Sequence, residues 1–233
     1  MSKEKILKDY YNAIIYTEEI WELLKSKRAR AGELLQMFGQ FNPFVYGSIA
    51  RGDINEKSDI DIIFLNQIPI FQVELILSKN GLEHYNREII MATPQDSLKL
   101  YIYLNEYETL TIPLTKLDKK ILEFYSFGGK INLAQLKENL RVPGIDKRLV
   151  FIKPTSDGHE ESSIINQEHV VAKQLGISLD TVMERKKVLL RREKHGRTGV
   201  FLKKELTRED SVSLVLKNLA DKKRIIRKKI FKK

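Results

Sequence analysis

The sequence contains no cysteine, which excludes disulfide bonds, thiolate metal sites and a thiol nucleophile. It also lacks an uninterrupted run of the roughly 18 apolar residues that a membrane-spanning helix needs. Its first residues, MSKEKILKDYYNAII, have neither the apolar core nor the small-residue cleavage site of a signal peptide. We therefore expect a cytoplasmic protein whose chemistry depends on oxygen and nitrogen groups and on bound metal ions.

Positive charge is unevenly distributed along the 233 residues. Residues 1–140 contain 17 Lys and Arg against 19 Asp and Glu, whereas residues 141–233 contain 24 against 12. A proline and a glycine follow a helical pattern at this boundary, so we predict two domains, 1–140 and 141–233. Clustered basic residues favour a polyanionic partner such as nucleic acid, because binding releases counterions. A basic surface that only contacts water is the simpler alternative.

The first part combines a helical pattern with two strand patterns. Apolar residues recur at helical spacing in residues 3–39, which predicts two or three helices there. FNPFVYG, residues 41–47, is typical of a short buried strand that ends at a glycine. SDIDIIFL, residues 58–65, is typical of a second strand.

Two acidic residues of this second strand, Asp59 and Asp61, are two positions apart, so their side chains should point to the same face. Neighbouring carboxylates repel each other unless a cation lies between them. Hard oxygen ligands with no histidine nearby favour Mg²⁺ over zinc. A polar strand face in contact with water is the alternative, but the surrounding apolar residues indicate a core strand. We therefore expect Asp59 and Asp61 to bind Mg²⁺.

A glycine and a serine, Gly47 and Ser48, follow the first strand directly. Glycine lets a phosphate approach the backbone closely, and a serine at the start of the next turn offers a hydroxyl and an N–H group. Arg51 lies three residues further on, within reach of the same anion. We expect these three residues to bind phosphate groups.

Together the two segments resemble the nucleotidyltransferase superfamily, which includes DNA polymerase β, the CCA-adding enzymes, the kanamycin nucleotidyltransferases and the small antitoxin nucleotidyltransferases. The family motif is an apolar residue, Gly-Ser or Gly-Gly, about ten further residues, and then Asp-x-Asp between apolar residues. This sequence matches the motif from Tyr46 to Asp61. The resemblance covers about residues 40–115 and implies a polymerase-β-like α+β fold, with a mixed sheet and flanking helices.

The resemblance also implies a reaction. A nucleoside triphosphate would bind at Gly47, Ser48 and Arg51, and its nucleoside monophosphate would pass to a hydroxyl acceptor. Asp59 and Asp61 would be the catalytic residues, with Mg²⁺ as cofactor.

Members of this family usually have a third carboxylate on a later strand. LKLYIYLNEYETLTIPL, residues 98–114, is typical of a hairpin, and Glu108 is the candidate in its second strand, residues 108–113. Glu88 is the second candidate, and a solvated residue at a turn is the alternative for Glu108. Without a third acid the protein would bind nucleotide and metal but transfer poorly.

The second part contains QEHVVAKQLGISLDTVMERKKVLLRR, residues 167–192, which resembles a helix-turn-helix. Gly176 lies in the turn, and Ser178 is placed to cap the second helix. An ordinary helical hairpin is the alternative. REKHGRTGVFLKKEL, residues 192–206, is typical of the two-stranded wing of a winged helix. The basic residues expected to face nucleic-acid phosphates are Arg191, Arg192, Lys194 and Arg197.

The sequence thus predicts a nucleotidyltransferase domain followed by a small basic winged-helix-like domain. The expected function is Mg²⁺-dependent transfer of a nucleoside monophosphate to a hydroxyl on nucleic acid or on an associated protein. The alternative is a non-catalytic DNA-binding regulator whose nucleotidyltransferase-like domain senses nucleotide. The sequence does not distinguish between acceptors, bases or oligomeric states.

Overall fold

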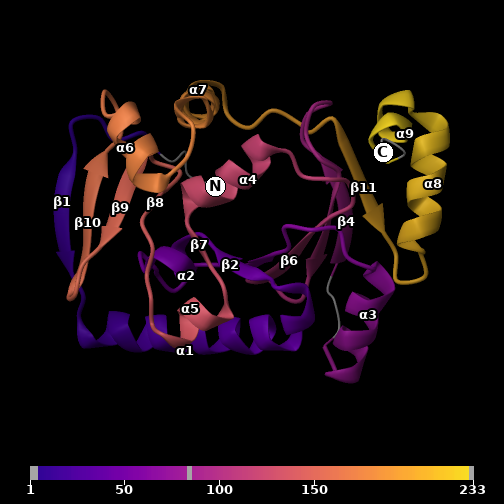
Figure 1. Cartoon of the computed structure of the whole chain (residues 1–233), viewed down its shortest axis with the longest axis horizontal. Coiled ribbons are helices and arrows are strands. Elements are labelled where there is room, and N and C mark those ends of the chain that lie inside the picture. The colour runs from indigo at the N-terminus through magenta and orange to yellow at the C-terminus, as the bar shows by residue number, and fades with distance from the viewer. Residues whose placement is uncertain (1–4, 83–85, 231–233) are drawn as a thin grey trace.

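The computed structural model describes residues 5–82 and 86–230, in which two β-sheets stand side by side above one long helix (Figure 1). That helix is α1 (Glu18–Met37). Thr17 caps its first turn by accepting a hydrogen bond from the Ile20 N–H, and Glu18 and Glu19 lie where the helix dipole favours negative charge. One capped helix therefore runs below both sheets (Figure 1).

The larger sheet has seven strands within the described residues, in the order β11-β4-β5-β6-β3-β2-β7. These strands are β2 (Phe44–Tyr46), β3 (Ile60–Ile63), β4 (Asn86–Met91), β5 (Lys99–Tyr103), β6 (Glu108–Pro113), β7 (Lys130–Ile131) and β11 (Leu202–Leu206). β3 and β6 are parallel, and the other neighbours are antiparallel. This mixed sheet with flanking helices confirms the predicted fold class, and both expected strands and the expected hairpin are present.

The main hydrophobic core lies between this sheet and α1. Leu34 and Leu35 of α1, and Phe38 directly after it, are fully buried in one cluster with Ile62 of β3 and Leu110 of β6. Other helices that contribute to this cluster include α3 (Ile70–Lys79), α8 (Val212–Lys222) and α9 (Arg224–Ile230), and the short helices α2 and α5 described below also add buried residues to it. The face of β3 that carries Ile62 is thereby closed to solvent and ligands.

The opposite face of the sheet is only partly covered. Helix α4 (Lys119–Gly128) packs there through Ile121 and Tyr125 against Ile63 of β3. Three short elements complete this part of the chain, namely η1 (Gly39–Phe41), α2 (Ser48–Arg51) and α5 (Leu133–Lys137). Because side chains alternate along a strand, Asp61 lies on the same face as Ile63.

The smaller sheet has the order β1-β10-β9-β8 within the described residues. Its strands are β1 (Tyr11–Ile15), β8 (Gly144–Ile145), β9 (Val150–Pro154) and β10 (Gly158–Ser163). Helices α6 (Glu168–Leu175) and α7 (Leu179–His195) pack beside it around Phe151, Val171 and Val182.

The prediction of two or three helices in residues 3–39 is wrong. Residues 11–15 form β1, an antiparallel edge strand paired with β10, and α1 is the α-helix of this region within the described residues. Apolar residues there recur at a spacing that also suits a helix. The side chains of β1 are nevertheless mostly exposed, with Tyr11 at 67% and Ile15 at 73%, so backbone pairing with a distant strand, not burial of a helical face, decides the conformation.

The two expected helices and the turn between them are present, and their assignment as a nucleic-acid-binding helix-turn-helix stays a prediction. Gly176 ends α6 in the left-handed region at φ 63°, and the Ser178 side chain caps α7 by accepting from the Thr181 N–H. The expected wing is not formed. Residues 196–201 are an extended connection without strand pairing, and β11 pairs with β4 at the edge of the larger sheet.

Each sheet takes strands from both sides of residue 140, through the β1–β10 and β11–β4 pairs. Residues 141–233 therefore contribute to both sheets, and their independence as a domain stays a prediction. No helix within the described parts of the chain is both long and apolar enough to cross a membrane.

Candidate active site

The paired aspartates lie at the beginning of β3. Asp61 is half-buried in the strand, and Asp59 precedes it and is exposed. Burial, followed by the negative charge of Asp59, raises the pKa of Asp61 to about 6. A carboxylate that is disfavoured by burial and by a like charge gains free energy when a cation binds beside it. Binding of a cation at this position should therefore be favourable.

The glycine-serine turn lies next to this pair. Tyr46, the last residue of β2, pairs directly with Asp61 in antiparallel register, so Gly47 and Ser48 follow beside the aspartates. Gly47 has φ 80°, which other residues adopt only with strain. Apart from its two chain neighbours, no described residue has an atom within 4 Å of the position that a Cβ of residue 47 would take, so open space faces its backbone. The structure thus brings the two motif segments together around an open turn.

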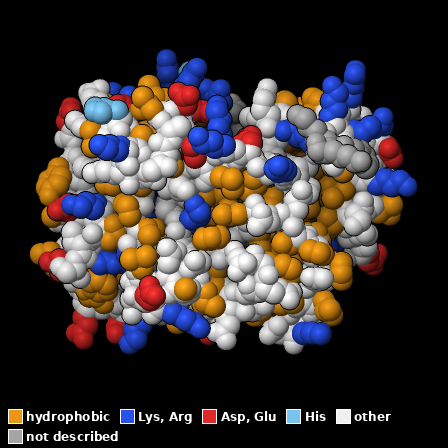
Figure 2. All heavy atoms as spheres, viewed as in Figure 1, with side chains coloured by type: hydrophobic (Ala, Val, Ile, Leu, Met, Phe, Trp, Pro, Cys, Tyr) orange, Lys and Arg blue, Asp and Glu red, His pale blue; other side chains and the backbone are white. Residues whose placement is uncertain are grey.

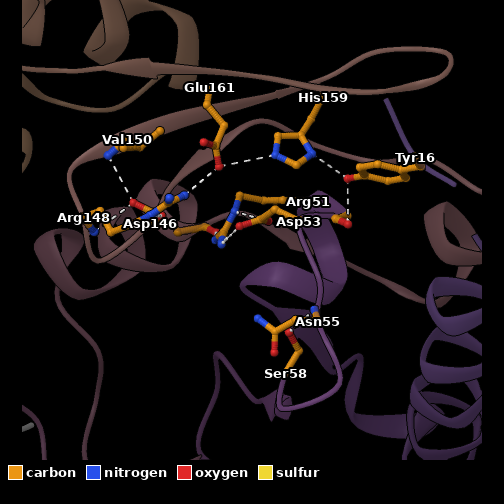
Figure 3. Close-up of polar contacts among 12 residues, drawn as sticks. Tyr16, Arg51, Asp53, Asn55, Ser58, Asp146, Arg148, Val150, His159 and Glu161 are labelled. Atoms are coloured by element: carbon orange, nitrogen blue, oxygen red, sulfur yellow. Dashed lines mark hydrogen bonds and ion pairs between the residues drawn. The ribbon is translucent and has the colours of Figure 1, made fainter. Parts of the chain in front are cut away.

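The Arg51 guanidinium is occupied by hydrogen bonds to other residues of the protein. It donates to both carboxylate oxygens of Asp53, at 2.8 Å each, and to the Gly128 carbonyl at 2.5 Å. The residue is 6% exposed, and Figure 3 shows Arg51 and Asp53 pointing toward each other. The contact with Gly128 fixes α2 to the C-terminal end of α4. The predicted phosphate contact of Arg51 stays a prediction.

A buried polar network extends from the α2 region, next to the Arg51 contacts, into the smaller sheet (Figure 3). The Tyr16 hydroxyl donates to the Gly52 carbonyl at 2.8 Å and lies 2.7 Å from Nδ1 of His159. His159 in turn contacts Glu161. Burial raises the pKa of Glu161, but hydrogen bonds from His159, Tyr10 and Arg148 outweigh it and lower the value to about 2. The sequence did not predict this hydrogen-bond network, because Tyr16, Gly52 and His159 are far apart in the chain.

Glu108 does not belong to the aspartate face. In the parallel β3–β6 register Asp61 pairs with Thr109, whereas Glu108 pairs with Ile60 and points the other way. Both its oxygens accept hydrogen bonds from Arg30 of α1, at 2.8 and 2.9 Å. Glu108 therefore connects the sheet to α1.

Glu88 lies on the same face as Asp61 but on β4, with β5 and β6 between them. At about 4.8 Å per strand the two backbones are roughly 14 Å apart. The Glu88 carboxylate pairs with Lys203 at 2.8 Å and accepts a hydrogen bond from the Tyr103 hydroxyl at 3.2 Å. Among the described residues, no three His, Cys, Asp or Glu side chains gather as a metal site would require. Within residues 5–82 and 86–230, the acid pair therefore has no third carboxylate beside it.

A family model for the nucleotidyltransferase domain matches residues 28–230. The chain belongs to the nucleotidyltransferase family. The match includes the Gly47–Asp61 motif and extends across residue 140 to the end of α9. No curated protein and no solved structure matches the chain.

The donor set of this nucleotidyltransferase suits a divalent metal ion of the kind that the family typically uses. Asp59 and Asp61 provide hard carboxylate oxygens, which Mg²⁺ prefers. Burial and the charge of Asp59 raise the pKa of Asp61 although the charge of Lys147 acts in the other direction, so a bound cation would stabilise the ionised carboxylate. The turn at Gly47 leaves room beside them. The residues present therefore fit the metal and a phosphate group together.

The four basic residues expected to bind nucleic acid lie together at the end of α7. Arg191, Arg192, Lys194 and Arg197 are all exposed, and no described acidic side chain forms an ion pair with any of them. Burial, followed by the charges of Arg197 and Arg191, lowers the pKa of Arg192. Figure 2 shows basic side chains gathered over α7. We call these four residues the α7 basic patch.

One face of the first half of α7 packs against α4, while Leu179 and Met183 on that half stay exposed. The Ser178 and Thr181 hydroxyls both donate to Glu123 at 2.5 Å, and the Arg185 guanidinium lies 4.6 Å from the centre of the Phe124 ring. Arg185 departs from the usual helix-turn-helix pattern because it packs on this aromatic ring. The N-terminal part of a recognition helix normally reads bases, and in this nucleotidyltransferase that part contacts α4.

Proposed function

We propose that the chain is a Mg²⁺-dependent enzyme that transfers a nucleoside monophosphate from a nucleoside triphosphate to a hydroxyl acceptor. The observation that carries this proposal is the β2–β3 register, in which Tyr46 pairs with Asp61. That register puts the open Gly47 turn beside the two aspartates in a chain of the nucleotidyltransferase family.

Each motif residue has a part in this reaction. Asp59 and Asp61 would hold Mg²⁺, which when bound neutralises the charge that develops on the phosphates. The missing side chain at Gly47 lets the triphosphate approach the backbone, and Ser48 offers its hydroxyl there. Arg51, held by Asp53 and Gly128, keeps the turn in position. Precise placement of the phosphates supplies most of the catalysis in phosphoryl transfer.

We propose nucleic acid as the acceptor, or a protein bound alongside it. The α7 basic patch supports this choice, because four exposed cations without acidic partners attract a phosphate backbone through counterion release. An acceptor bound in this way would be chosen by shape and charge.

A non-catalytic regulator that senses nucleotide is the second candidate. The observation that favours it is Thr109, which occupies the strand position in register with Asp61 where a third carboxylate would complete the site. With two acids alone, no carboxylate is placed to accept the proton of an attacking hydroxyl. Such a protein would bind Mg²⁺ and nucleotide without releasing pyrophosphate.

One experiment separates the two functions. The full chain is incubated with Mg²⁺, total cellular RNA or DNA and each nucleoside triphosphate labelled at the α-phosphate. An enzyme transfers label to an acceptor and releases pyrophosphate, and the Asp61→Asn variant does neither. Nucleotide binding by calorimetry without label transfer or pyrophosphate release in any mixture would refute transfer and support the regulator.

The α7 basic patch is tested with matched variants. Replacing Arg191, Arg192 and Arg197 together by Ala should weaken RNA binding to every sequence and reduce the salt slope by up to about three. The control replaces Lys217, Lys222 and Arg224 of α8 and α9, which are also exposed, so the net charge changes equally. An equal loss in both triple variants would contradict a binding site at α7.

A further inference from the structure

A pocket of about 600 Å³ lies between α1 and α5, away from the aspartates. Its apolar walls include Leu24 of α1 and Leu133 and Leu136 of α5. The two helices approach closely at Gly32, where a Cβ would lie 3.3 Å from the Leu136 side chain. Because α1 covers the sheet face opposite Asp61, this pocket is separate from the candidate active site. Its volume is typical of small-molecule sites.

Two arginines give the pocket a positive end. Arg28 donates only to the backbone carbonyls of Ile49 and Leu140, and its buried Nε has no hydrogen-bond partner. Arg141 likewise donates to backbone carbonyls, at residues 155 and 158. Burial, followed by the charge of Arg141, lowers the pKa of Arg28 to about 10. Arg28 is buried at 7% exposure, and buried charges are normally paired, yet no described acidic side chain forms an ion pair with it. Arg141 is half-buried beside it and adds a second positive charge.

The acidic residues of the pocket do not supply a paired anion. Glu22 pairs with Lys25 at 3.5 Å, and Glu33 pairs with Arg30 at 2.8 Å. Both glutamates are exposed on the outer side of α1, and neither forms an ion pair with a pocket arginine. The inner end of the pocket therefore keeps its positive charge.

An aromatic wall stands beside this charge. Trp21, the single tryptophan of the chain, lines the pocket. Its ring lies 4.9 Å from the Arg141 guanidinium and 4.9 Å from the centre of the Tyr16 ring. These contacts hold the indole in place, so a flat apolar group can pack on it without first ordering it.

The same arginines contact the helix at the active-site turn. Arg28 donates to the Ile49 carbonyl of α2, and Arg141 lies so close to Gly52 that a Cβ there would come within 2.7 Å of its side chain. Figure 1 shows α5 against α1, with α2 beside them. The Arg28 side chain thus connects the pocket directly to α2, the helix that begins at Ser48.

We propose that the α1–α5 pocket binds a small molecule that carries a phosphate or carboxylate group on a flat apolar body. The anionic group would pair with Arg28 and Arg141, and the flat body would pack on Trp21 and the leucines. This ligand site is distinct from the nucleotide site and does not depend on nucleotidyl transfer.

The test uses the full chain labelled with 5-fluorotryptophan, which places a single fluorine at Trp21. The probes are 1-naphthyl phosphate and uncharged 1-naphthol, added without Mg²⁺ or nucleotide. We expect saturable movement of the single ¹⁹F resonance by the phosphate, with a dissociation constant at least about tenfold lower than that of naphthol. Arg28→Met should weaken binding of the phosphate but not of naphthol.

Two matched variants locate the site. Ala29 is exposed and lines the pocket, so Ala29→Phe should fill it and abolish the shift. Ala134 is exposed on α5 outside the pocket lining, so Ala134→Phe should bind as the parent does. The proposal is overturned if naphthyl phosphate causes no shift, if naphthol binds as tightly, or if Ala29→Phe retains the parent's affinity.

Discussion

Replacing Asp61 by asparagine should stabilise the metal-free protein, although it removes a proposed metal ligand. Burial and the charge of Asp59 raise the pKa of the Asp61 carboxyl to about 6. Against an ordinary value near 3.9, this corresponds to about 3 kcal/mol at 1.36 kcal/mol per pKa unit. The folded protein incurs this cost only where Asp61 is ionised, so the cost is complete above pH 6 and disappears below pH 3.9.

The expected pH dependence follows from these two pKa values. The Asp61→Asn variant should gain up to about 3 kcal/mol of unfolding free energy at pH 7, about 1.5 kcal/mol at pH 5 and nothing at pH 3. Urea denaturation in EDTA measures this gain. Asp59→Asn, which removes only the neighbouring charge, should give a smaller gain at pH 7.

Magnesium should reverse the order of stability. A ligand that binds only the folded state stabilises it in proportion to its affinity, so millimolar Mg²⁺ with a triphosphate should raise the melting temperature of the parent and leave that of Asp61→Asn unchanged. A variant that is less stable than the parent at pH 7 in EDTA, or whose gain does not change with pH, would refute the reasoning.

Three further substitutions test the remaining assignments. Gly47→Val should weaken triphosphate binding by about tenfold or more, which is 1.4 kcal/mol, while Mg²⁺ binding alone changes less; calorimetry showing unchanged triphosphate affinity would contradict an open phosphate turn. Glu108→Gln should lower the unfolding free energy by about 1–3 kcal/mol, because Arg30 loses the more buried of its two charged partners and keeps only the exposed Glu33. Triphosphate binding should persist, and its loss would show that Glu108 takes part in the site. Hydrogen bonds from Ser178 and Thr181 lower the pKa of Glu123 to about 2, so Glu123→Gln should lower the melting temperature at pH 7. That loss should shrink as the pH falls from 4.5 toward 2, because the parent carboxylate becomes protonated; equal melting temperatures at pH 7 would show that this contact does not hold α7 on α4.

The sequence predicted the centre of the candidate site because its information is local there. The glycine at position 47 marks a turn at φ 80°, and the residues around Asp61 mark a buried strand. The distance between them in the chain is short enough for β2 and β3 to be neighbours. Family resemblance and strand alternation therefore indicate the same two carboxylates.

The flanking residues could not be assigned in this way. Glu108 was a candidate acid from sequence, but a one-residue change in strand register moves a side chain to the other face. In the observed register Thr109 lies on the same face as Asp61, whereas Glu108 points to the other face and binds Arg30. Arg51 could likewise reach an anion from its position in the chain, and only the folded structure shows Asp53 and Gly128 around it.

By itself, the sequence determined the turn at Gly47, the acid pair at the beginning of β3, the two helices α6 and α7 with the turn between them, and the basic character of the second part. Each of these depends on residues close together in the chain, where backbone preference and side-chain spacing suffice. Only the tertiary structure decided that residues 11–15 are a strand and that residues 202–206 extend the larger sheet. A strand has no internal hydrogen bonds, so its partner, which here lies more than 100 residues away, determines whether it forms.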